Sequence, residues 1–384
     1  MKFTTEQTRK ILCGVHGLDS QKRGKGGTQE ITKKLCCIQV DPIDAAGKNH
    51  DLTLFSRVED YGPSYLRELL YEDRELFEYY CKMLSILPVE TYPYFRNFME
   101  KQERKLEPFF HEHREHIEYI MDVMEDRPVS SLELKDMGPN RKQAWRTAKM
   151  CSRILRNLWL AGRTAISHRV GGRKYYTSVE DVVPREYLEK ETTADDITKA
   201  KVTEMIVKAS RLVSPSKASA QWNSVGGVRQ VTKFLKRLEE ESKVFSLEVR
   251  GWKGRLYAHE DDRPYWEEPY EPETPFVTFM APLDPMLWNR ELFSTIFKHE
   301  YLWEIYKKKE DRKYGYYCLP VIFDGDYVAI MEPNFRKDDA VLEIKNMHII
   351  NETMDKEVFE HELDKELERF MKFLKAEDLE VKYA

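Results

Sequence analysis

The chain has 384 residues, of which 41% are hydrophobic and 12% aromatic, enough apolar material for two or three domains with packed cores. Charged residues make up 34% of the chain and the formal net charge is −5, an average that argues against a nucleic-acid partner. No run approaches the ~18 apolar residues of a membrane span, and the first residues, MKFTTEQTRK, lack the apolar core of a signal peptide. We therefore expect a cytoplasmic protein without membrane contact.

Cysteine and histidine residues give no metal or redox pattern. The six cysteines are scattered without a CxxC pair, so we expect reduced, mostly buried thiols rather than disulfides or structural zinc. The histidines at positions 111, 113 and 116 do not share one face of the helix expected over residues 109–124, and we interpret them as solvated. No metal and no other cofactor is expected.

The N-terminal residues predict a helix over residues 5–18, a basic glycine-rich loop over residues 21–28 and a second helix over residues 29–36. The loop could cradle a phosphate through its backbone amides, but it lacks the Walker pattern, and a plain flexible loop is the simpler interpretation. The second helix leads into the stretch LCCIQVDPID, residues 35–44.

This stretch carries an amide and a carboxylate two positions apart, Gln39 and Asp41. Pro42 excludes the α region for the residue before it, so Asp41 is expected to be extended. Side chains at i and i+2 of an extended run share a face, so the pair should point the same way, with Ile38 and Val40 facing the core. Such a pair is suited to position one water molecule, although most Gln-x-Asp sequences are solvated surface.

The middle of the chain predicts helices and hairpins in a repeating order. Residues 49–80 predict helix, turn and helix. PVSSLEL is typical of the entry to a helix-turn-helix, and a helix over residues 141–161 and a β-hairpin around Gly171-Gly172 follow it. That order is typical of a winged helix and recurs more weakly over residues 198–258. Counting the N-terminal part as the first, we predict three winged helices in tandem.

Charge is segregated along the chain. Residues 141–176 hold ten Lys or Arg and no Asp or Glu, and residues 199–237 hold nine basic residues and one acid, whereas seven acids lie between residues 260 and 273. This distribution predicts a basic face on an acidic protein, as a polyanion partner requires. A pair of solvated basic helices is the alternative.

The C-terminal part begins with an acid- and proline-rich stretch, residues 260–275, that predicts a solvated connector. Residues 314–335 and 341–350 then alternate like antiparallel strands, with a hairpin turn at Asp324-Gly325, and an apolar stripe marks a terminal helix. The predicted fold class is α+β, mainly α, with tandem winged helices and a small C-terminal β-domain. The expected parts are an N-terminal winged-helix unit (1–107), a basic second winged helix (108–190), a third winged helix (191–259), and the connector, β-domain and terminal helix (260–384).

Several long stretches, in this order, are LCCIQVDPI, HDLTLFSRVEDYGPSYLRELLYEDRELFEYY, SILPVETYPYFRNFM, PVSSLEL, APLDPMLWNRELF and YGYYCLPVIFDGDYVAIMEP. Through them the chain resembles the AlkZ/YcaQ-type winged-helix DNA glycosylases over nearly its whole length. The resemblance implies a C-shaped set of winged helices that holds duplex DNA. It also implies excision of N7-alkylated purines and, as in several members, unhooking of interstrand crosslinks.

The family's catalytic motif is Gln-Φ-Gln or Gln-Φ-Asp, with Φ apolar, and this chain has the second form. The resemblance therefore implies that Gln39 and Asp41 are catalytic. The chain departs from the family at Glu332, where a shorter acid is expected, at Phe335, where many relatives have a small polar residue, and in the shorter, more basic wing at residues 171–174. These departures bear on lesion preference.

The implied reaction is that of a monofunctional glycosylase. Hydrolysis of an N-glycosidic bond passes through an oxocarbenium-like sugar, and an N7-alkylguanine is already cationic, so its departure needs no acid. Asp41 would accept a proton from water and stabilise the sugar cation, while Gln39 would hold the same water. Neither a metal nor a lysine Schiff base is required. Because a crosslinked base cannot be flipped freely, we expect a shallow, open site.

The expected partner is double-stranded DNA that carries alkylated bases or crosslinks, bound by a monomer. Phosphate contacts are expected from Arg141, Lys142, Arg146, Lys149, Arg153, Arg156, Arg173 and Lys174. Further candidates in the matching stretches are His50, Arg57, Asn289 and Arg290. The first two could instead brace the junction after the motif, and Trp288 is interpreted as core rather than as a base-stacking wedge. Two rival functions stay open: a non-catalytic winged-helix regulator, and an enzyme acting on small N7 or N3 adducts only.

Overall fold

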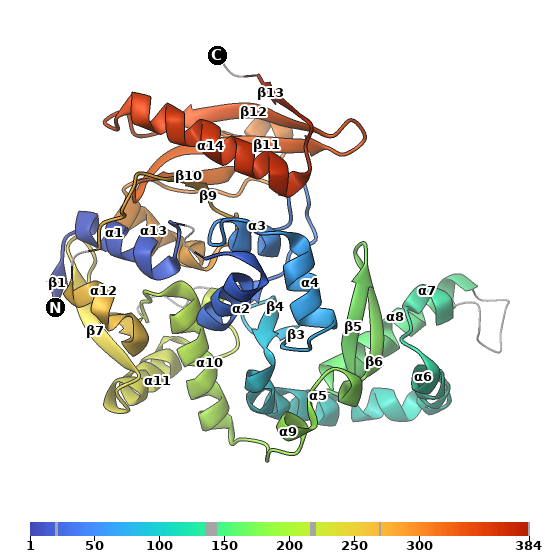
Figure 1. Ribbon diagram of the computed structural model, residues 1–384. Coiled ribbons are helices and arrows are strands. Elements are labelled where there is room, and N and C mark those ends of the chain that lie inside the picture. The colour runs from blue at the N-terminus through green and yellow to red at the C-terminus, as the bar shows by residue number, and fades with distance from the viewer. Residues whose placement is uncertain (20–21, 135–143, 216–219, 269, 383–384) are drawn as a thin grey trace. The chain divides into compact units, whose positions relative to one another are not determined.

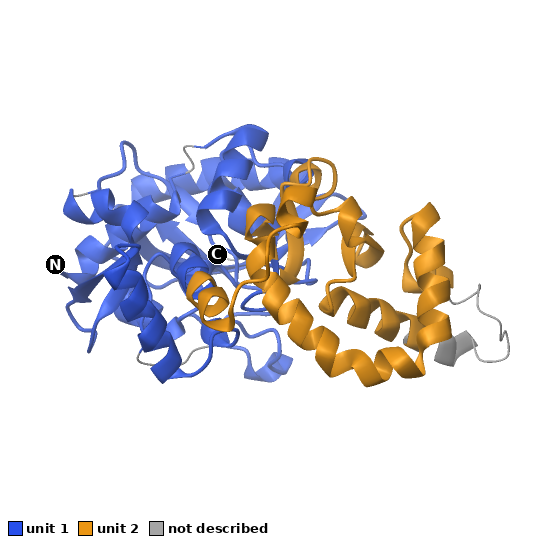
Figure 2. Ribbon diagram, turned by 90° about the horizontal axis from the view of Figure 1, so that it is seen from below, with its two compact units in different colours: residues 1–66, 81–85, 202–384 blue, residues 67–80, 86–201 orange. Residues whose placement is uncertain are grey.

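The computed structural model describes residues 1–19, 22–134, 144–215, 220–268 and 270–382 (Figure 1). The chain forms two compact units, which Figure 2 distinguishes by colour. Unit 1 holds residues 1–66, 81–85 and 202–384, and unit 2 holds residues 67–80 and 86–201. Helices and strands are present in both, which confirms the α+β class. The four sequence-based ranges cross the borders of these units and stay a prediction. Within the described part, no helix combines the length and apolarity that crossing a bilayer would take.

Unit 1 begins with β1 (Lys2–Phe3) and α1 (Thr5–His16). A capping box starts α1: the Gln7 amide N–H donates to the Thr4 hydroxyl over 3.1 Å, and the Thr4 N–H donates to the Gln7 side chain over 3.0 Å. Two otherwise unpaired N–H groups are satisfied in this way. Gly17 ends the helix in the left-handed region, with φ 66°. The first predicted helix is confirmed.

The next helix, α2 (Gly24–Leu35), begins inside the stretch that the sequence predicts as a loop, so that prediction is wrong for residues 24–28. A carboxylate from a distant segment supplies the missing cap, because the Gly24 N–H donates to Asp60 over 2.5 Å. A Cβ at Gly27 would lie 3.0 Å from the Lys22 Cβ. Glycine is therefore required there for close backbone packing rather than for flexibility.

The candidate motif follows α2 in β2 (Ile38–Gln39), and α3 (Asn49–Phe55) and α4 (Pro63–Tyr71) come next. Further along the chain lie α10 (Asp195–Ser210), α11 (Val228–Glu240), β7 (Val244–Val249) and β8 (Leu256–His259). The predicted β7–β8 hairpin is confirmed, and β1 adds to it as a parallel third strand beside β7.

The acidic stretch after β8 is not a solvated connector throughout, which corrects the prediction. It forms a 3-10 turn (Glu260–Asp262) and α12 (Arg263–Glu267), and Trp266 is only 3% exposed. Beyond α12, the ring of Tyr270 lies 2.7 Å from the position that a Cβ on Gly14 would occupy. Asp262 in this stretch is also buried, 1% exposed, and pairs with Arg211 over 3.1 Å. Amino-acid composition does not show which of the acidic and aromatic side chains are buried in this way.

A five-stranded sheet with the order β13-β12-β11-β10-β9 closes unit 1. Its strands are β9 (Val277–Phe279), β10 (Leu319–Phe323), β11 (Asp326–Arg336), β12 (Val341–Ile349) and β13 (Asp378–Val381), and α13 (Arg290–Phe297) lies between β9 and β10 in sequence. The predicted turn is confirmed, with φ positive at Asp324 and Gly325. Helix α14 (Lys356–Leu374) runs along the sheet (Figure 1), and the Phe370 ring packs 5.4 Å from the Phe279 ring. The predicted apolar stripe is therefore its buried face.

Unit 2 consists of two hairpins and several helices. The elements are β3 (Leu76–Tyr80), most of β4 (Leu84–Pro88), α5 (Tyr92–Glu112), α6 (Arg114–Asp126), α7 (Ser131–Leu134), α8 (Ala144–Leu160), β5 (Thr164–Val170), β6 (Arg173–Ser178) and α9 (Arg185–Leu188). The predicted basic helix and its hairpin are confirmed as α8 and β5–β6. Residues 76–80, predicted as helix, are instead a strand of aromatic and β-prone residues. The helix predicted over residues 109–124 is interrupted at His113.

Candidate active site

The backbone of the Gln-Val-Asp motif is held from both sides. The Val40 N–H donates to the Leu84 carbonyl over 2.8 Å, which pairs the motif with the start of β4. On the other side, the side chain of Asn49, only 1% exposed, donates from Nδ2 to the Gln39 carbonyl over 2.9 Å. The Oδ1 atom of the same amide accepts the Leu283 N–H over 2.8 Å. Asn49 therefore ties the motif to the segment that precedes α13.

The side chain of Gln39 has a defined orientation. It is 7% exposed, and its Oε1 atom accepts a hydrogen bond from the Lys82 ammonium over 2.9 Å. Since a lysine ammonium is a donor only, the amide oxygen must face it, and the Nε2 group must point elsewhere. Gln39 therefore presents N–H donors to whatever occupies the remaining space beside the motif.

Asp41 lies two residues beyond Gln39 and is half-buried. Because β2 ends at Gln39, strand alternation alone does not fix the direction of the Asp41 side chain, and its sharing a face with Gln39 stays a prediction. One carboxylate oxygen, Oδ1, accepts the Ile43 N–H over 3.0 Å. This Asx turn fixes the carboxylate through one of its two oxygens. Pro42, which lies between Asp41 and Ile43, is compatible with such a turn.

The Asp41 carboxylate also lies near a buried phenol. Burial raises the pKa of Tyr317 well above its ordinary value, and the negative charges of Asp41, Asp44 and Asp51 act in the same direction. The Tyr317 hydroxyl donates to the Gly47 carbonyl over 3.3 Å. Tyr317 is thus a neutral donor that supports the loop after the motif.

Lys82 is the residue that sequence reasoning missed. It is half-buried in the turn before β4, and its Nζ atom lies 4.7 Å from the centre of the Trp288 ring in addition to its bond to Gln39. Burial lowers the pKa of Lys82 to about 8, and the guanidinium of Arg290 adds to this effect. The only sequence signal was a lone lysine in the apolar run YYCKMLSIL.

The stretch LDPMLWNR, residues 283–290, packs next to the motif. Trp288 is 6% exposed and donates from Nε1 to the Leu283 carbonyl over 3.0 Å, so it belongs to the core. Its ring faces the Lys82 ammonium. Asn289 caps α13 by accepting the Leu292 N–H over 3.1 Å. Arg290 donates to the Pro282 carbonyl over 2.8 Å and stacks over Tyr301. These contacts give Asn289 and Arg290 structural roles next to the site.

Arg57 is fully enclosed, with a side chain 0% exposed. Its Nη1 and Nη2 atoms lie 2.7 and 2.9 Å from the two carboxylate oxygens of Asp284, and Nη2 also donates to His16 Nδ1 over 3.1 Å. Burial, together with the charge of Arg57, keeps the pKa of His16 well below its ordinary value, so this imidazole is neutral. A guanidinium enclosed in this way cannot reach DNA, which leaves the brace as its role. His50 is half-buried, with Nε2 3.6 Å from the Asp51 carboxylate.

A model of the AlkZ-like DNA glycosylase family matches residues 32–373, nearly the whole chain, including the Gln-Val-Asp motif and Lys82. The chain belongs to the AlkZ-like DNA glycosylase family. It is therefore a DNA glycosylase, an enzyme whose substrate is DNA. Among solved structures it is similar to the Streptomyces sahachiroi DNA glycosylase AlkZ, with 13% sequence identity, 99% of each chain covered and a TM-score of 0.65. At this identity the likeness concerns the fold.

Because the substrate is DNA, the basic residues of unit 2 are candidates for phosphate contacts. Arg153, Arg156 and Arg173 are exposed, and the Arg153 guanidinium stacks 4.7 Å from the centre of the Phe109 ring. Lys174 is half-buried with its ammonium 4.6 Å from the centre of the Trp159 ring, and burial lowers its pKa to about 8. Arg141 and Lys142 lie outside the described residues, and Arg146 and Lys149 belong to α8 without described side chains.

Of the departures from the family pattern, Glu332 has a local explanation in this AlkZ-like chain, whereas the contact described for Phe335 is made by its backbone and does not explain its side chain. The Glu332 carboxylate accepts the Tyr316 N–H over 2.6 Å, and a Cβ on Gly315 would collide with it, so the longer acid reaches a neighbouring turn. The Phe335 N–H donates to the Ala45 carbonyl over 2.7 Å, which attaches the end of β11 to the loop after the motif.

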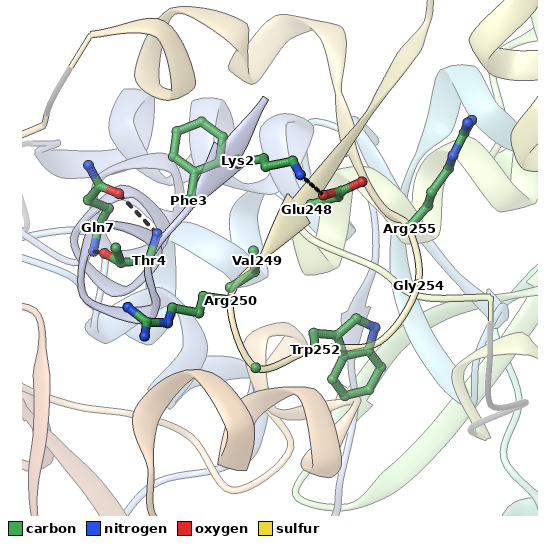
Figure 3. Close-up of a pocket in the computed structure, with 11 residues that line it drawn as sticks. Lys2, Phe3, Thr4, Gln7, Glu248, Val249, Arg250, Trp252, Gly254 and Arg255 are labelled. Atoms are coloured by element: carbon green, nitrogen blue, oxygen red, sulfur yellow. Dashed lines mark hydrogen bonds and ion pairs between the residues drawn. The ribbon is translucent and has the colours of Figure 1, made fainter.

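A surface pocket of about 610 Å³ lies elsewhere in unit 1, between β1 and the β7–β8 turn. Figure 3 shows Lys2 pointing toward Glu248 across it, and Arg250 and Trp252 on the turn below. Neither Gln39 nor Asp41 lines this pocket, so its size gives no reason to place the chemistry there.

Proposed function

We propose that this glycosylase hydrolyses the N-glycosidic bond of cationic N7-alkylpurines in duplex DNA, with Gln39 and Asp41 positioning and activating the water. The observation that carries the proposal is the fixed presentation of the Gln39 amide. The oxygen of its side-chain amide accepts from Lys82, and its backbone carbonyl accepts from Asn49. The direction of its Nε2 donors is therefore set, and the half-buried carboxylate of Asp41 follows two residues later.

The chemistry follows from the charge of the leaving base. An N7-alkylated purine departs as a neutral molecule without being protonated, so the enzyme needs one carboxylate rather than the acid–base pair of ordinary glycosidases. Asp41 takes a proton from the attacking water and opposes the positive charge that develops on the sugar. The Gln39 Nε2 group donates to the same water; this hydrogen bond occupies one lone pair of the water oxygen and orients the other toward C1′.

The positions of the two side chains suit these roles. The Asx bond to Ile43 occupies one oxygen of the Asp41 carboxylate and leaves the other to accept a proton. The backbone clamp by Asn49 is buried, so the motif is held by a rigid element and not by a solvated loop. A water held by two preorganised groups pays little entropy in the transition state.

We also propose that unit 2 contributes phosphate contacts through Arg153, Arg156, Arg173 and Lys174, as in a winged-helix protein that grips DNA through its backbone. The aromatic rings beneath Arg153 and Lys174 fix the direction of the two cations. Backbone recognition is sequence-tolerant, which suits a repair enzyme that finds lesions anywhere. We further propose that the enzyme unhooks interstrand crosslinks as well as removing single alkylated bases.

The test measures release of 7-methylguanine from a methylated duplex under single-turnover conditions. Asp41→Asn should abolish release while DNA affinity is retained. The matched control is Asp44→Asn, a carboxylate of the same loop that pairs with Lys337 and is not assigned to the chemistry. If Asp41→Asn releases base at the wild-type rate, the assignment is wrong. A nitrogen-mustard crosslink assayed beside the methylated duplex decides between crosslink unhooking and an activity confined to monoadducts.

A further inference from the structure

The segment between α13 and β10 carries aromatic and basic side chains that base excision, as proposed above, does not use. It reads KHEYLWEIYKKKEDRKYGYY over residues 298–317 and belongs to unit 1, as does the Gln-Val-Asp motif. Tyr306 in this segment is 84% exposed, more than any other large apolar or aromatic side chain that the structure describes. A single exposed ring is ordinary on a protein surface, so its meaning depends on how it is held and on what surrounds it.

The loop that carries Tyr306 is held in one conformation by a buried carboxylate. Glu304 is 1% exposed, and its two oxygens accept the Lys313 N–H over 3.1 Å and the Tyr314 N–H over 2.7 Å. These bonds join the start of the loop to its end. Because the loop is ordered before a ligand arrives, little conformational entropy is lost when Tyr306 binds one.

Both ends of the segment adjoin the candidate active site. At one end, the Tyr301 ring lies 4.4 Å from the guanidinium of Arg290, which belongs to the stretch packed next to the motif. At the other end, the Tyr317 hydroxyl donates to the carbonyl of Gly47, in the loop after the motif, over 3.3 Å. The exposed part of the segment therefore projects from the border of the site.

A series of ring contacts limits how far Tyr306 lies from this border. The Trp303 ring is 5.8 Å from the Tyr306 ring and 6.4 Å from the Tyr317 ring, so the two tyrosine rings are at most about 12 Å apart. That distance corresponds to about three to four nucleotides of a stacked strand, at ~3.4 Å each. Tyr306 is thus within reach of a DNA strand whose reacting sugar lies at the motif.

The charges around Tyr306 complement a phosphate backbone. Residues 306–313 hold five basic and two acidic side chains. Lys308 and Lys309 are exposed, and neither forms an ion pair with any residue that the structure describes. An aromatic ring beside unpaired cations is the combination by which proteins bind unstacked nucleotides, since the ring stacks on the base and the cations contact the phosphates.

We propose that Tyr306 stacks on an unpaired base of the bound DNA, and that Lys308 and Lys309 contact the phosphates that flank this base. The proposal deepens the proposed function and rests on it, because it requires that the DNA lies along the motif.

The chemistry of the site gives a reason for such a contact. In an intact duplex the neighbouring base pairs screen the glycosidic bond, so the helix must open locally to bring C1′ to the motif, and opening leaves a base face without its stacking partner. An aromatic ring of the protein replaces part of the lost stacking. It does so for any sequence, because every base has a π-face.

The test measures binding of the full-length protein to two DNA probes by fluorescence anisotropy. One probe is a duplex with a single bulged thymine, and the other is the same duplex fully paired; neither carries an alkylated base. We expect wild type to bind the bulged probe at least about fivefold more tightly, from the stacking of one base. Tyr306→Ala should bind the two probes equally, and Tyr306→Phe, which retains the ring, should keep the preference.

The matched control is Tyr316→Ala. Tyr316 belongs to the same segment and is 42% exposed, but the Arg312 guanidinium lies over its ring, 4.8 Å from the centre. This variant should keep the wild-type preference. The double variant Lys308→Gln/Lys309→Gln should also keep it, while its slope of log affinity against log salt falls by about two for both probes.

Equal binding of the two probes by wild type would overturn the proposal. So would a preference that persists in Tyr306→Ala, or one that is lost in Tyr306→Phe or in Tyr316→Ala. An unchanged salt slope in the double lysine variant would overturn the phosphate contacts. Because the probes contain no lesion, these outcomes are distinguishable from failure to release 7-methylguanine, which would contradict the proposed function instead.

Discussion

Removal of the Arg57 guanidinium tests whether this residue is a brace or a DNA contact. Both partners of the Arg57–Asp284 pair have side chains 0% exposed, with two N–O contacts of 2.7 and 2.9 Å. In Arg57→Met the Asp284 carboxylate would remain buried without its partner. Breaking a buried ion pair on one side costs about 3–5 kcal/mol, and we expect the free energy of unfolding to fall by that amount.

A double-mutant cycle separates the charge interaction from lost packing. Asp284→Asn keeps the oxygen that accepts the Met286 N–H but leaves Arg57 buried and unpaired. In the double variant Arg57→Met/Asp284→Asn neither charge remains, so its loss of stability should be smaller than the sum of the single losses by at least about 2 kcal/mol. Urea unfolding of the four proteins, followed by tryptophan fluorescence, gives these values.

The salt dependence of DNA binding completes this test. A buried brace contributes no phosphate contact, so the slope of log affinity against log salt should be equal in wild type and in folded Arg57→Met. A loss of less than about 1 kcal/mol in stability for Arg57→Met, or a flatter salt slope at unchanged stability, would contradict the role of Arg57 as a buried brace.

Two further predictions concern the site and its DNA contacts. Asn49→Ala removes two buried hydrogen bonds; it should cost about 1–3 kcal/mol per unpaired group and slow base release, as urea unfolding and the single-turnover assay would show, and unchanged values of both would contradict the clamp. Arg153→Gln and Arg156→Gln should each weaken binding equally across DNA sequences and reduce the salt slope by about one; fluorescence anisotropy at several salt concentrations measures this, and an unchanged slope would remove these residues from the interface.

Local rules predicted much of the fold. The first helix, the hairpins, the turn at Asp324-Gly325 and the stripe on α14 each depend on residues close in sequence, so capping, turn chemistry and periodicity were sufficient. The glycine-rich stretch before residue 29 failed because its cap, Asp60, comes from a distant segment. The acidic stretch after β8 failed because burial of Trp266 is a tertiary property that acidic composition hides.

The site was predictable in the same uneven way. Gln39 and Asp41 could be found from a proline rule and a resemblance, since Pro42 follows the motif directly and one of the matching stretches contains the motif itself. Lys82 could not be found, because the amide that it contacts is 43 positions away and the ring beneath it is Trp288. Arg57 was a candidate from its position in a matched stretch, and only the structure shows that its guanidinium is enclosed. The sequence shows which side chains are charged, but it does not show whether a charged side chain is buried.

The most direct test of the account is the single-turnover rate of 7-methylguanine release by Asp41→Asn compared with wild type. Removal of a general base typically costs 10²- to 10⁴-fold, and we predict a loss of at least about 10²-fold with DNA affinity within about twofold of wild type. A rate within about threefold of wild type would contradict the central claim that Asp41 activates the water.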